Sequence, residues 1–168
     1  MHFEVEHEFP AARAAVAEVL CDPDFHTHLD LPDLSRPEVV AHSVDGSQRV
    51  LRLRYRYVGQ LDPIARKIVG GRDLTWIQEL RLDTTTFAGT LSFSAEEEPR
   101  RVNGSADVAI VAVDGTRSRR RIAGDFHLRI PVVGGTAEKK IVPGLLRRLD
   151  VEAEALRDRL GSARPGQL

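Results

Sequence analysis

The sequence lacks several features that would assign the protein to a specialised class. It contains a single cysteine, Cys21, among 168 residues, which excludes an internal disulfide and favours a reducing compartment. No apolar run approaches the roughly 20 residues that span a bilayer, and the first residues lack the basic and apolar stretches of a signal peptide. We therefore expect a cytoplasmic protein without stable membrane insertion.

The chain also lacks a strong net charge and any recognisable catalytic or cofactor motif. Its formal net charge of −1 gives no global field that would attract nucleic acid. No serine lies in a nucleophile elbow, and the glycine pairs at positions 70–71 and 134–135 do not match a phosphate-binding loop. The sequence therefore predicts no catalytic residue, no cofactor, no metal and no nucleic-acid partner.

What the sequence does contain is a series of alternating segments, each typical of a half-buried β-strand. In residues 2–9 the side chains of Phe3, Val5, His7 and Phe9 share one face, and the other face is largely acidic. The Asp45-Gly46 pair that follows the second strand is a strong signal for a tight hairpin. The same alternation predicts further strands at residues 38–44, 48–58, 74–82, 86–95, 101–113 and 117–130.

Helical spacing predicts three helices. Residues 11–20 follow Pro10 and are rich in helix formers, while residues 63–69 end at a glycine pair. The longest helix covers residues 137–160 with Thr136 as its N-cap, and Pro143 predicts a kink or a late start within it. Its apolar stripe consists of Val142, Leu146, Leu149, Ala153, Leu156 and Leu160.

This order of elements, β–α–ββ–α–ββββ–α, resembles the helix-grip fold of the START-like (SRPBCC) superfamily. The segment at residues 129–141, RIPVVGGTAEKKI, is similar to a signature of an uncharacterised bacterial family in that superfamily. The resemblance implies an α+β fold in which a curved antiparallel sheet of about 6–7 strands wraps around the long C-terminal helix. We expect one domain over residues 1–161 and a flexible tail at residues 162–168.

The superfamily includes lipid carriers, hormone-binding proteins and polyketide cyclases, so the resemblance implies a cavity between the sheet and the last helix. We expect this cavity to bind a small hydrophobic or amphipathic molecule, such as a lipid, an isoprenoid or a polyketide-like compound, without catalysis. Tyr55, Tyr57, Trp76 and Gln78 are the candidates for anchoring its polar groups. The predicted ligand-binding residues are Leu53, Tyr55, Tyr57, Trp76, Gln78, Leu80, Leu91, Phe93, Ile110, Phe126, Leu128, Leu146, Leu149 and Ala153.

Two other functions stay open at this point. The small residues Gly89, Ala106 and Gly124 on the same predicted face favour empty space, whereas a protein-interaction module would have a filled core. Such a module would bind a partner through its arginines or its last helix. Whichever function holds, the protein is expected to be a monomer or a homodimer. An enzyme of the cyclase or hydrolase type needs acids or bases in the cavity, and the predicted inner faces offer few beyond Tyr55 and His7.

Several polar features have a structural explanation that we prefer to a functional one. Residues 22–37 are predicted to form a loop with one short helical turn, so His26 and His28 are expected to be solvated and not metal ligands. The arginines within residues 52–56 and 117–121, Arg120 included, are expected on a solvated convex face with cross-strand ion pairs. Cys21 is expected to be a buried structural thiol, and His7 a satisfied inner or edge histidine.

Overall fold

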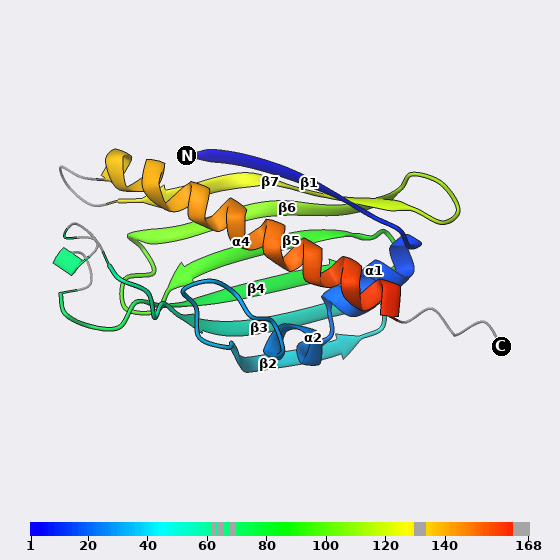
Figure 1. Cartoon of the computed structure of the whole chain (residues 1–168), viewed down its shortest axis with the longest axis horizontal. Helices are drawn as coiled ribbons and strands as arrows, with labels where there is room; N and C mark the ends of the chain where they lie inside the picture. Colours follow the sequence, from blue (N-terminus) through cyan, green and yellow to red (C-terminus); the bar gives the residue numbers. More distant parts are fainter. Residues whose placement is uncertain (62, 64–65, 68–69, 130–133, 163–168) are drawn as a thin grey trace.

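The computed structural model describes residues 1–61, 63, 66–67, 70–129 and 134–162, which form a curved sheet crossed by one long helix (Figure 1). The antiparallel strands are ordered β1-β7-β6-β5-β4-β3-β2 across the sheet. In chain order they are β1 (His2–Phe9), β2 (Glu38–Asp45), β3 (Gln48–Arg56), β4 (Thr75–Asp83), β5 (Ala88–Ala95), β6 (Val102–Ala112) and β7 (Ser118–Leu128). The helices with described bounds are α1 (Arg13–Leu20), α2 (Pro23–Thr27) and α4 (Gly134–Ser162).

The strands and the first helix lie where the residue pattern predicts them, within a few residues at their ends. The alternation is confirmed in β1, where Phe3 and Phe9 are buried. The predicted hairpin joins β2 to β3, and Gly46 adopts a φ of 56° there, a conformation that favours glycine. α2 is the short helical turn predicted within residues 22–37. The predicted helix at residues 63–69 lies largely outside the described residues. Of the predicted tail at residues 162–168, Ser162 is the last residue of α4, and the rest lies outside the described residues.

The last helix is longer than predicted and continues through its proline. α4 begins at Gly134 and runs past Pro143 to Ser162, so the predictions of a late start and of Thr136 as N-cap were wrong. Pro143 removes one backbone hydrogen bond, whereas Val142 and Leu149 are 5% and 1% exposed and hold the helix in place by packing. No helix within the described ranges combines the length and the apolarity needed to cross a bilayer.

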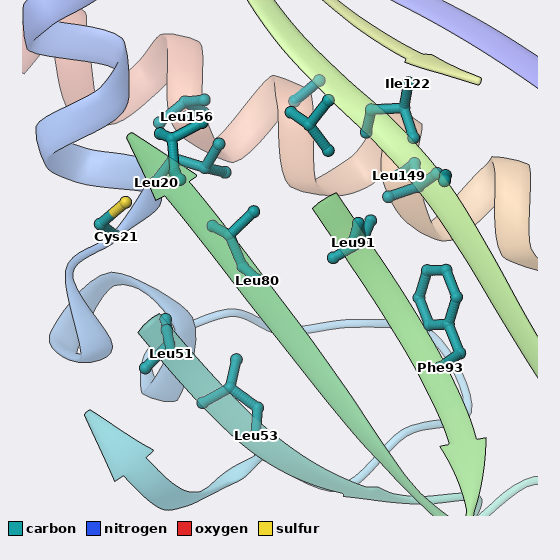
Figure 2. Packing of buried hydrophobic residues seen from close by; sticks show 14 of the residues in the cluster. Leu20, Cys21, Leu51, Leu53, Leu80, Leu91, Phe93, Ile122, Leu149 and Leu156 are labelled. Atoms are coloured by element: carbon teal, nitrogen blue, oxygen red, sulfur yellow. The ribbon is translucent and has the colours of Figure 1, made fainter. Parts of the chain in front are cut away.

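α4 lies diagonally across the concave face of the sheet, with α1 against its C-terminal part (Figure 1). The helix backbone comes closest to β1 and β7, at one side of the sheet. Toward β3, β4 and β5 the interior is filled by side chains. Figure 2 shows Leu51, Leu80 and Leu91 of the sheet in one cluster with Leu149 and Leu156 of α4. Because both layers present apolar faces, one core forms between them.

The small residues on the concave face do not leave the space that the sequence suggested. A Cβ atom on Gly89 would lie 1.8 Å from the carbonyl oxygen of Arg81, and one on Gly124 would lie 2.1 Å from that of Ser105. Both distances are far below van der Waals contact, so the backbone of the neighbouring strand already occupies the position. These glycines permit close approach of neighbouring strands, which corrects the prediction that they enlarge a cavity.

The outer face of the sheet carries the predicted cross-strand ion pairs. Arg52 of β3 lies 3.2 Å from Glu79 of β4. Arg119 of β7 lies 2.6 Å from Glu8 of β1. Arg120 is the exception to the prediction, because its side chain is 1% exposed and lies on the inner face.

Candidate functional site

Charged and polar side chains lie inside the molecule, between α4 and the sheet. The side chains of Arg120 and Glu152 are 1% and 3% exposed, and that of Arg148 is 7% exposed. Buried charges are costly unless they are paired, so their partners determine what the site can do. We refer to six residues as the inner polar cluster: Tyr55 (β3), Gln78 (β4), Arg120 (β7), His26 (α2), and Arg148 and Glu152 (both α4).

The centre of the inner polar cluster is an ion pair between Arg120 and Glu152. Arg120 Nη1 donates to Glu152 Oε1 at 2.5 Å. Burial by itself would raise the pKa of Glu152, but the positive charges around it, that of Arg120 above all, hold this pKa below its usual value. Glu152 is therefore ionised at neutral pH, and Arg120 neutralises it.

His7 connects this ion pair to the surface. Arg120 Nη2 donates to His7 Nδ1 at 3.2 Å, so the ring proton is on Nε2, which donates to Asp150 Oδ1 at 2.9 Å. The imidazole is 6% exposed, whereas Asp150 is 58% exposed. Burial lowers the pKa of His7 despite the bond to Asp150, so the ring is neutral. The prediction of a satisfied inner histidine is confirmed.

Arg148 differs from Arg120 in how much of its guanidinium lacks an acceptor among the described residues: two nitrogens, Nε and Nη1, against Nε alone in Arg120. Its Nη2 donates to Gln78 Oε1 and lies 3.9 Å from Glu152 Oε2. Its Cζ lies 4.5 Å from the centre of the Tyr55 ring, and Tyr55 stacks on the half-buried Trp76 with 5.7 Å between ring centroids. Among the described residues, nothing accepts a hydrogen bond from Arg148 Nε or Nη1, and the Tyr55 hydroxyl has no partner. The interior therefore contains several buried donors that are free.

His26 faces the interior, which corrects the prediction of a solvated pair of histidines. It is 1% exposed, and its Nε2 donates to the Leu20 carbonyl at 2.7 Å. Burial lowers the pKa of His26, so the ring is neutral and Nδ1 is an unprotonated acceptor. His28 is exposed and donates to the Asp24 carbonyl, so the two rings do not face a common ion. Within the described part of the chain, no group of three or more His, Cys, Asp or Glu side chains is placed to hold a metal.

The space left beside these polar groups is small. A cavity of about 10 Å³ is lined by Leu20, His26, Gln78, Leu80, Leu91, Val108, Arg120, Ile122 and Glu152. A single water molecule needs a cavity of roughly 10–15 Å³ by this measure, so the cavity holds one water at most. The protein's own side chains therefore occupy most of the volume in which a ligand cavity was expected.

Most of the residues predicted to bind a ligand lie in this interior. Trp76 and Leu146 are half-buried at its border. Tyr57 lies beyond the end of β3, and its hydroxyl donates to the Gln60 carbonyl at 3.4 Å, away from the inner polar cluster. The buried ones are Leu53, Tyr55, Gln78, Leu80, Leu91, Phe93, Ile110, Phe126, Leu128, Leu149 and Ala153. Their role in binding stays a prediction.

The charged members of the inner polar cluster were not predicted. Arg120 has the same parity along β7 as the buried Ile122 and Phe126, so strict alternation was a signal for its position. Charged residues are rarely buried, and that expectation is wrong here. Arg148 and Glu152 border the apolar stripe of α4, and no sequence pattern separates them from the exposed residues beside it.

A larger hollow lies on the outside of the molecule. It has a volume of about 450 Å³ and is open to solvent between the helices α1 and α2 and the strands β2 and β3. Arg49 beside it donates to the carbonyls of Gly46 and Gln48. Cys21 at its wall is buried, and burial raises the pKa of the thiol to about 11, as expected for a structural thiol. None of the free buried polar atoms among the described residues belongs to this outer groove.

Comparison with known proteins supports the same architecture. The family model described as "Protein of unknown function (DUF2505)" matches residues 4–160. No curated protein matches the chain significantly.

Several solved structures share the fold. A protein of Thermus thermophilus has a TM-score of 0.70 and 17% identity, covering 98% of this chain and 100% of its own. The ZhuI aromatase/cyclase of a Streptomyces species has a TM-score of 0.65 and 18% identity, covering 95% and 92%. Norcoclaurine synthase of Thalictrum flavum, in complex with dopamine and hydroxybenzaldehyde, has a TM-score of 0.63 and 16% identity, covering 99% and 89%. These similarities show the helix-grip fold that the sequence resemblance implied.

Proposed function

The chain belongs to the DUF2505 family of proteins of unknown function, and from that premise we propose that it binds a small amphipathic molecule between the sheet and α4 without converting it. The polar part of the molecule binds at the inner polar cluster, and its apolar part lies among the leucine and aromatic side chains beside it. The observation that carries the proposal is the set of buried donors on Arg148 and Tyr55 that no described residue satisfies.

Free donors of this kind are costly in a folded protein. A buried donor without an acceptor destabilises the fold by about 1–3 kcal/mol, and native proteins contain few of them unless another molecule supplies the acceptor. Next to these donors, Trp76, Leu145 and Leu146 are only half-buried, so apolar surface continues from the inner polar cluster toward solvent. A polar end beside an apolar path suits an amphipathic molecule.

The ligand needs more room than the cavity of about 10 Å³, and side chains are able to provide it. The gap between α4 and the strands β3 to β5 is spanned by long side chains such as Arg148 and Gln78, because the helix backbone lies closer to β1 and β7. Arginine and glutamine have several staggered rotamers, so a rotation of Arg148 opens space without moving the sheet. We infer that the cavity enlarges as the ligand enters.

Native mass spectrometry of the gently purified protein tests the proposal, followed by denaturing extraction and identification of any released molecule. We expect a stoichiometric small molecule with an apolar body and at least one polar group. A bare protein mass, together with no binding of an apolar fluorescent dye, contradicts the proposal.

Two variants separate the interior from the outer groove. Leu149→Trp enlarges a side chain that is 1% exposed beneath α4, so the bound molecule should be lost. Val44→Trp places the same ring at the outer groove, where Val44 is 58% exposed, and should leave the molecule bound. Circular dichroism of both variants verifies the fold. Loss of the molecule in Val44→Trp and its retention in Leu149→Trp would show that the binding site is the outer groove.

A second candidate function is an enzyme of the cyclase or hydrolase type at the same site. The interior holds more acids and bases than the sequence indicated, since His26 and the ionised Glu152 both line the small cavity and His26 Nδ1 is free. Glu152 is bonded to Arg120, however, so binding without conversion is the function that the geometry supports better. His26→Gln decides between them: an enzyme requires that the molecule extracted from the variant differ from that of the wild type, and identical molecules contradict catalysis by His26.

A further inference from the structure

We propose that the ligand of this site is a carboxylate, bound through Arg148 and Tyr55. The inference rests on the proposed function and names the chemical class that the site recognises. Three features support it: the net charge of the interior, the position of the free donors, and the aromatic rings that hold them.

The buried charges under α4 do not cancel. Arg120 and Arg148 each carry a positive charge, and Glu152 is the one buried carboxylate among the described residues. The two buried histidines are neutral, because burial lowers the pKa of each. Asp150 is 58% exposed and bonds to a histidine, so it lies at the surface. One positive charge is therefore left without a buried counter-charge, and a monoanionic ligand would neutralise it.

The uncompensated charge belongs to Arg148. Glu152 Oε1 is 2.5 Å from Arg120, whereas Glu152 Oε2 is 3.9 Å from Arg148. On this side of the ion pair, three donors find no acceptor among the described residues: Arg148 Nε, Arg148 Nη1 and the Tyr55 hydroxyl. A carboxylate offers two oxygens with about four lone-pair sites, so it accepts from the guanidinium and from the phenol together. A neutral alcohol would leave the charge in place.

Tyr55 is held as a neutral donor with a defined orientation. Burial raises the pKa of its hydroxyl, and the nearby Arg148 opposes this only in part, so the phenol keeps its proton. The Tyr55 ring stacks on the Trp76 ring, with 5.7 Å between their centroids, and Arg148 Cζ lies 4.5 Å from the centre of the Tyr55 ring. A donor of defined orientation beside a cation favours a planar acceptor such as a carboxylate. A phosphate monoester carries about 1.5 to 2 negative charges at neutral pH and would over-neutralise the single positive charge.

Three probes with the same ten-carbon tail test the inference: decanoate, 1-decanol and decyltrimethylammonium. Trp76 is the only tryptophan of the chain and stacks on Tyr55, so its fluorescence reports binding at the site. We expect decanoate to bind the wild-type protein at least about tenfold more tightly than 1-decanol, and decyltrimethylammonium to bind more weakly than both.

Variants assign the preference to particular side chains. Arg148→Gln should lower the affinity for decanoate to that for 1-decanol and leave the latter unchanged. Tyr55→Phe removes a hydroxyl that bonds to no described residue, so the thermal stability of the ligand-free protein should not fall, while decanoate should bind several-fold more weakly. Arg119→Gln is the matched control, because it removes one positive charge from the outer face, where the side chain is 40% exposed. It should change neither affinity.

The outcomes separate this inference from the proposed function. Equal affinities of the wild type for decanoate and 1-decanol overturn the carboxylate and leave amphipathic binding standing. Failure of all three probes to bind, with a bare native mass, overturns the proposed function itself. A loss of decanoate binding in Arg119→Gln as large as in Arg148→Gln shows general charge attraction and also overturns the assignment to Arg148.

Discussion

Two adjacent arginines on β7, Arg119 and Arg120, form the same ion pair in opposite surroundings. On the outer face Arg119 lies 2.6 Å from Glu8, and the two side chains are 40% and 53% exposed. On the inner face Arg120 lies 2.5 Å from Glu152, and the side chains are 1% and 3% exposed. Because the chemical groups and distances match, access of water is what separates the two pairs. An exposed pair adds little stability, whereas a buried charge that loses its partner destabilises the fold strongly.

The two faces of the sheet also differ in whether their positive charges are balanced. Arg52, Arg54 and Arg121 on the outer face have carboxylate partners, and water screens whatever charge is left there. Inside, Arg148 shares Glu152 with Arg120, and burial keeps bulk solvent from screening the imbalance of charge. The excess positive charge of the interior, and not the charge of the outer face, therefore favours binding of an anion.

The largest expected effect comes from removing the acidic partner on each face. Glu152→Ala leaves two arginines buried without a carboxylate and should lower the free energy of unfolding by about 3–5 kcal/mol. Glu8→Ala should cause no measurable change, because Arg119 stays in water. Urea denaturation of both variants measures the difference, and equal shifts of the midpoint would contradict the comparison.

A double-mutant cycle sharpens the comparison. Arg120→Met, Glu152→Leu and the double variant should show a coupling energy of about 1–3 kcal/mol between the inner partners. The corresponding cycle on Arg119 and Glu8 should show no measurable coupling. Adding Arg148→Met to the inner double variant should make the triple variant more stable than the double variant, because in the double variant Arg148 stays buried without its carboxylate. A destabilised triple variant would show that Arg148 does not carry the excess charge.

The pH dependence of stability should come from the inner face. Burial lowers the pKa of both His7 and His26 below the ordinary 6.5, so below pH 6.5 the unfolded chain binds protons that the folded protein does not. Their stabilising contribution is complete above pH 6.5 and is lost as the pH falls below it, by up to about 1.4 kcal/mol per pH unit for each histidine. Urea midpoints between pH 7.5 and 5.5 should show this decrease. His26→Gln should reduce the slope of this decrease, and an unchanged slope argues against a buried neutral ring at position 26.

The smallest expected effect concerns salt. At about 1 M salt the screening length is roughly 3 Å, so any difference in stability between the wild type and Arg119→Gln should disappear. The difference between the wild type and Arg148→Gln should persist, because the guanidinium is 7% exposed and salt does not reach it. Thermal unfolding at low and high salt measures both, and a loss of the Arg148→Gln effect would show that the inner site is open to solvent.

Most of the fold was predictable because strands repeat every two residues and each strand carries its own signal. Phe3 and Phe9 on β1 identify the buried face without information from any other segment. The course of α4 was less predictable, since Pro143 is a local signal for interruption and the packing of Val142 and Leu149 against the sheet overrides it. Local propensity is a weak guide wherever tertiary packing acts on the same residues.

The candidate site was predictable only in its apolar and aromatic part. Tyr55 and Gln78 were placed on the inner face by alternation, and both are buried. His26 was misplaced because its burial depends on the short helix α2 turning the ring toward the Leu20 carbonyl. The prediction for Arg120 was wrong although the alternation along β7 indicated the inner face. The cost of burying a charge argues against that face unless the partner of the charge is known.

The strands, their apolar faces and the long final helix could be read from single segments of the chain, because each of these patterns is local. The contact between Arg148 and Gln78, 70 residues apart, and the single carboxylate that Arg148 shares with Arg120 arise from the packing of α4 on the sheet. These contacts depend on where α4 crosses the sheet. The net charge of the interior cannot be read from one segment of the chain, because the charged residues that contribute to it come from different elements.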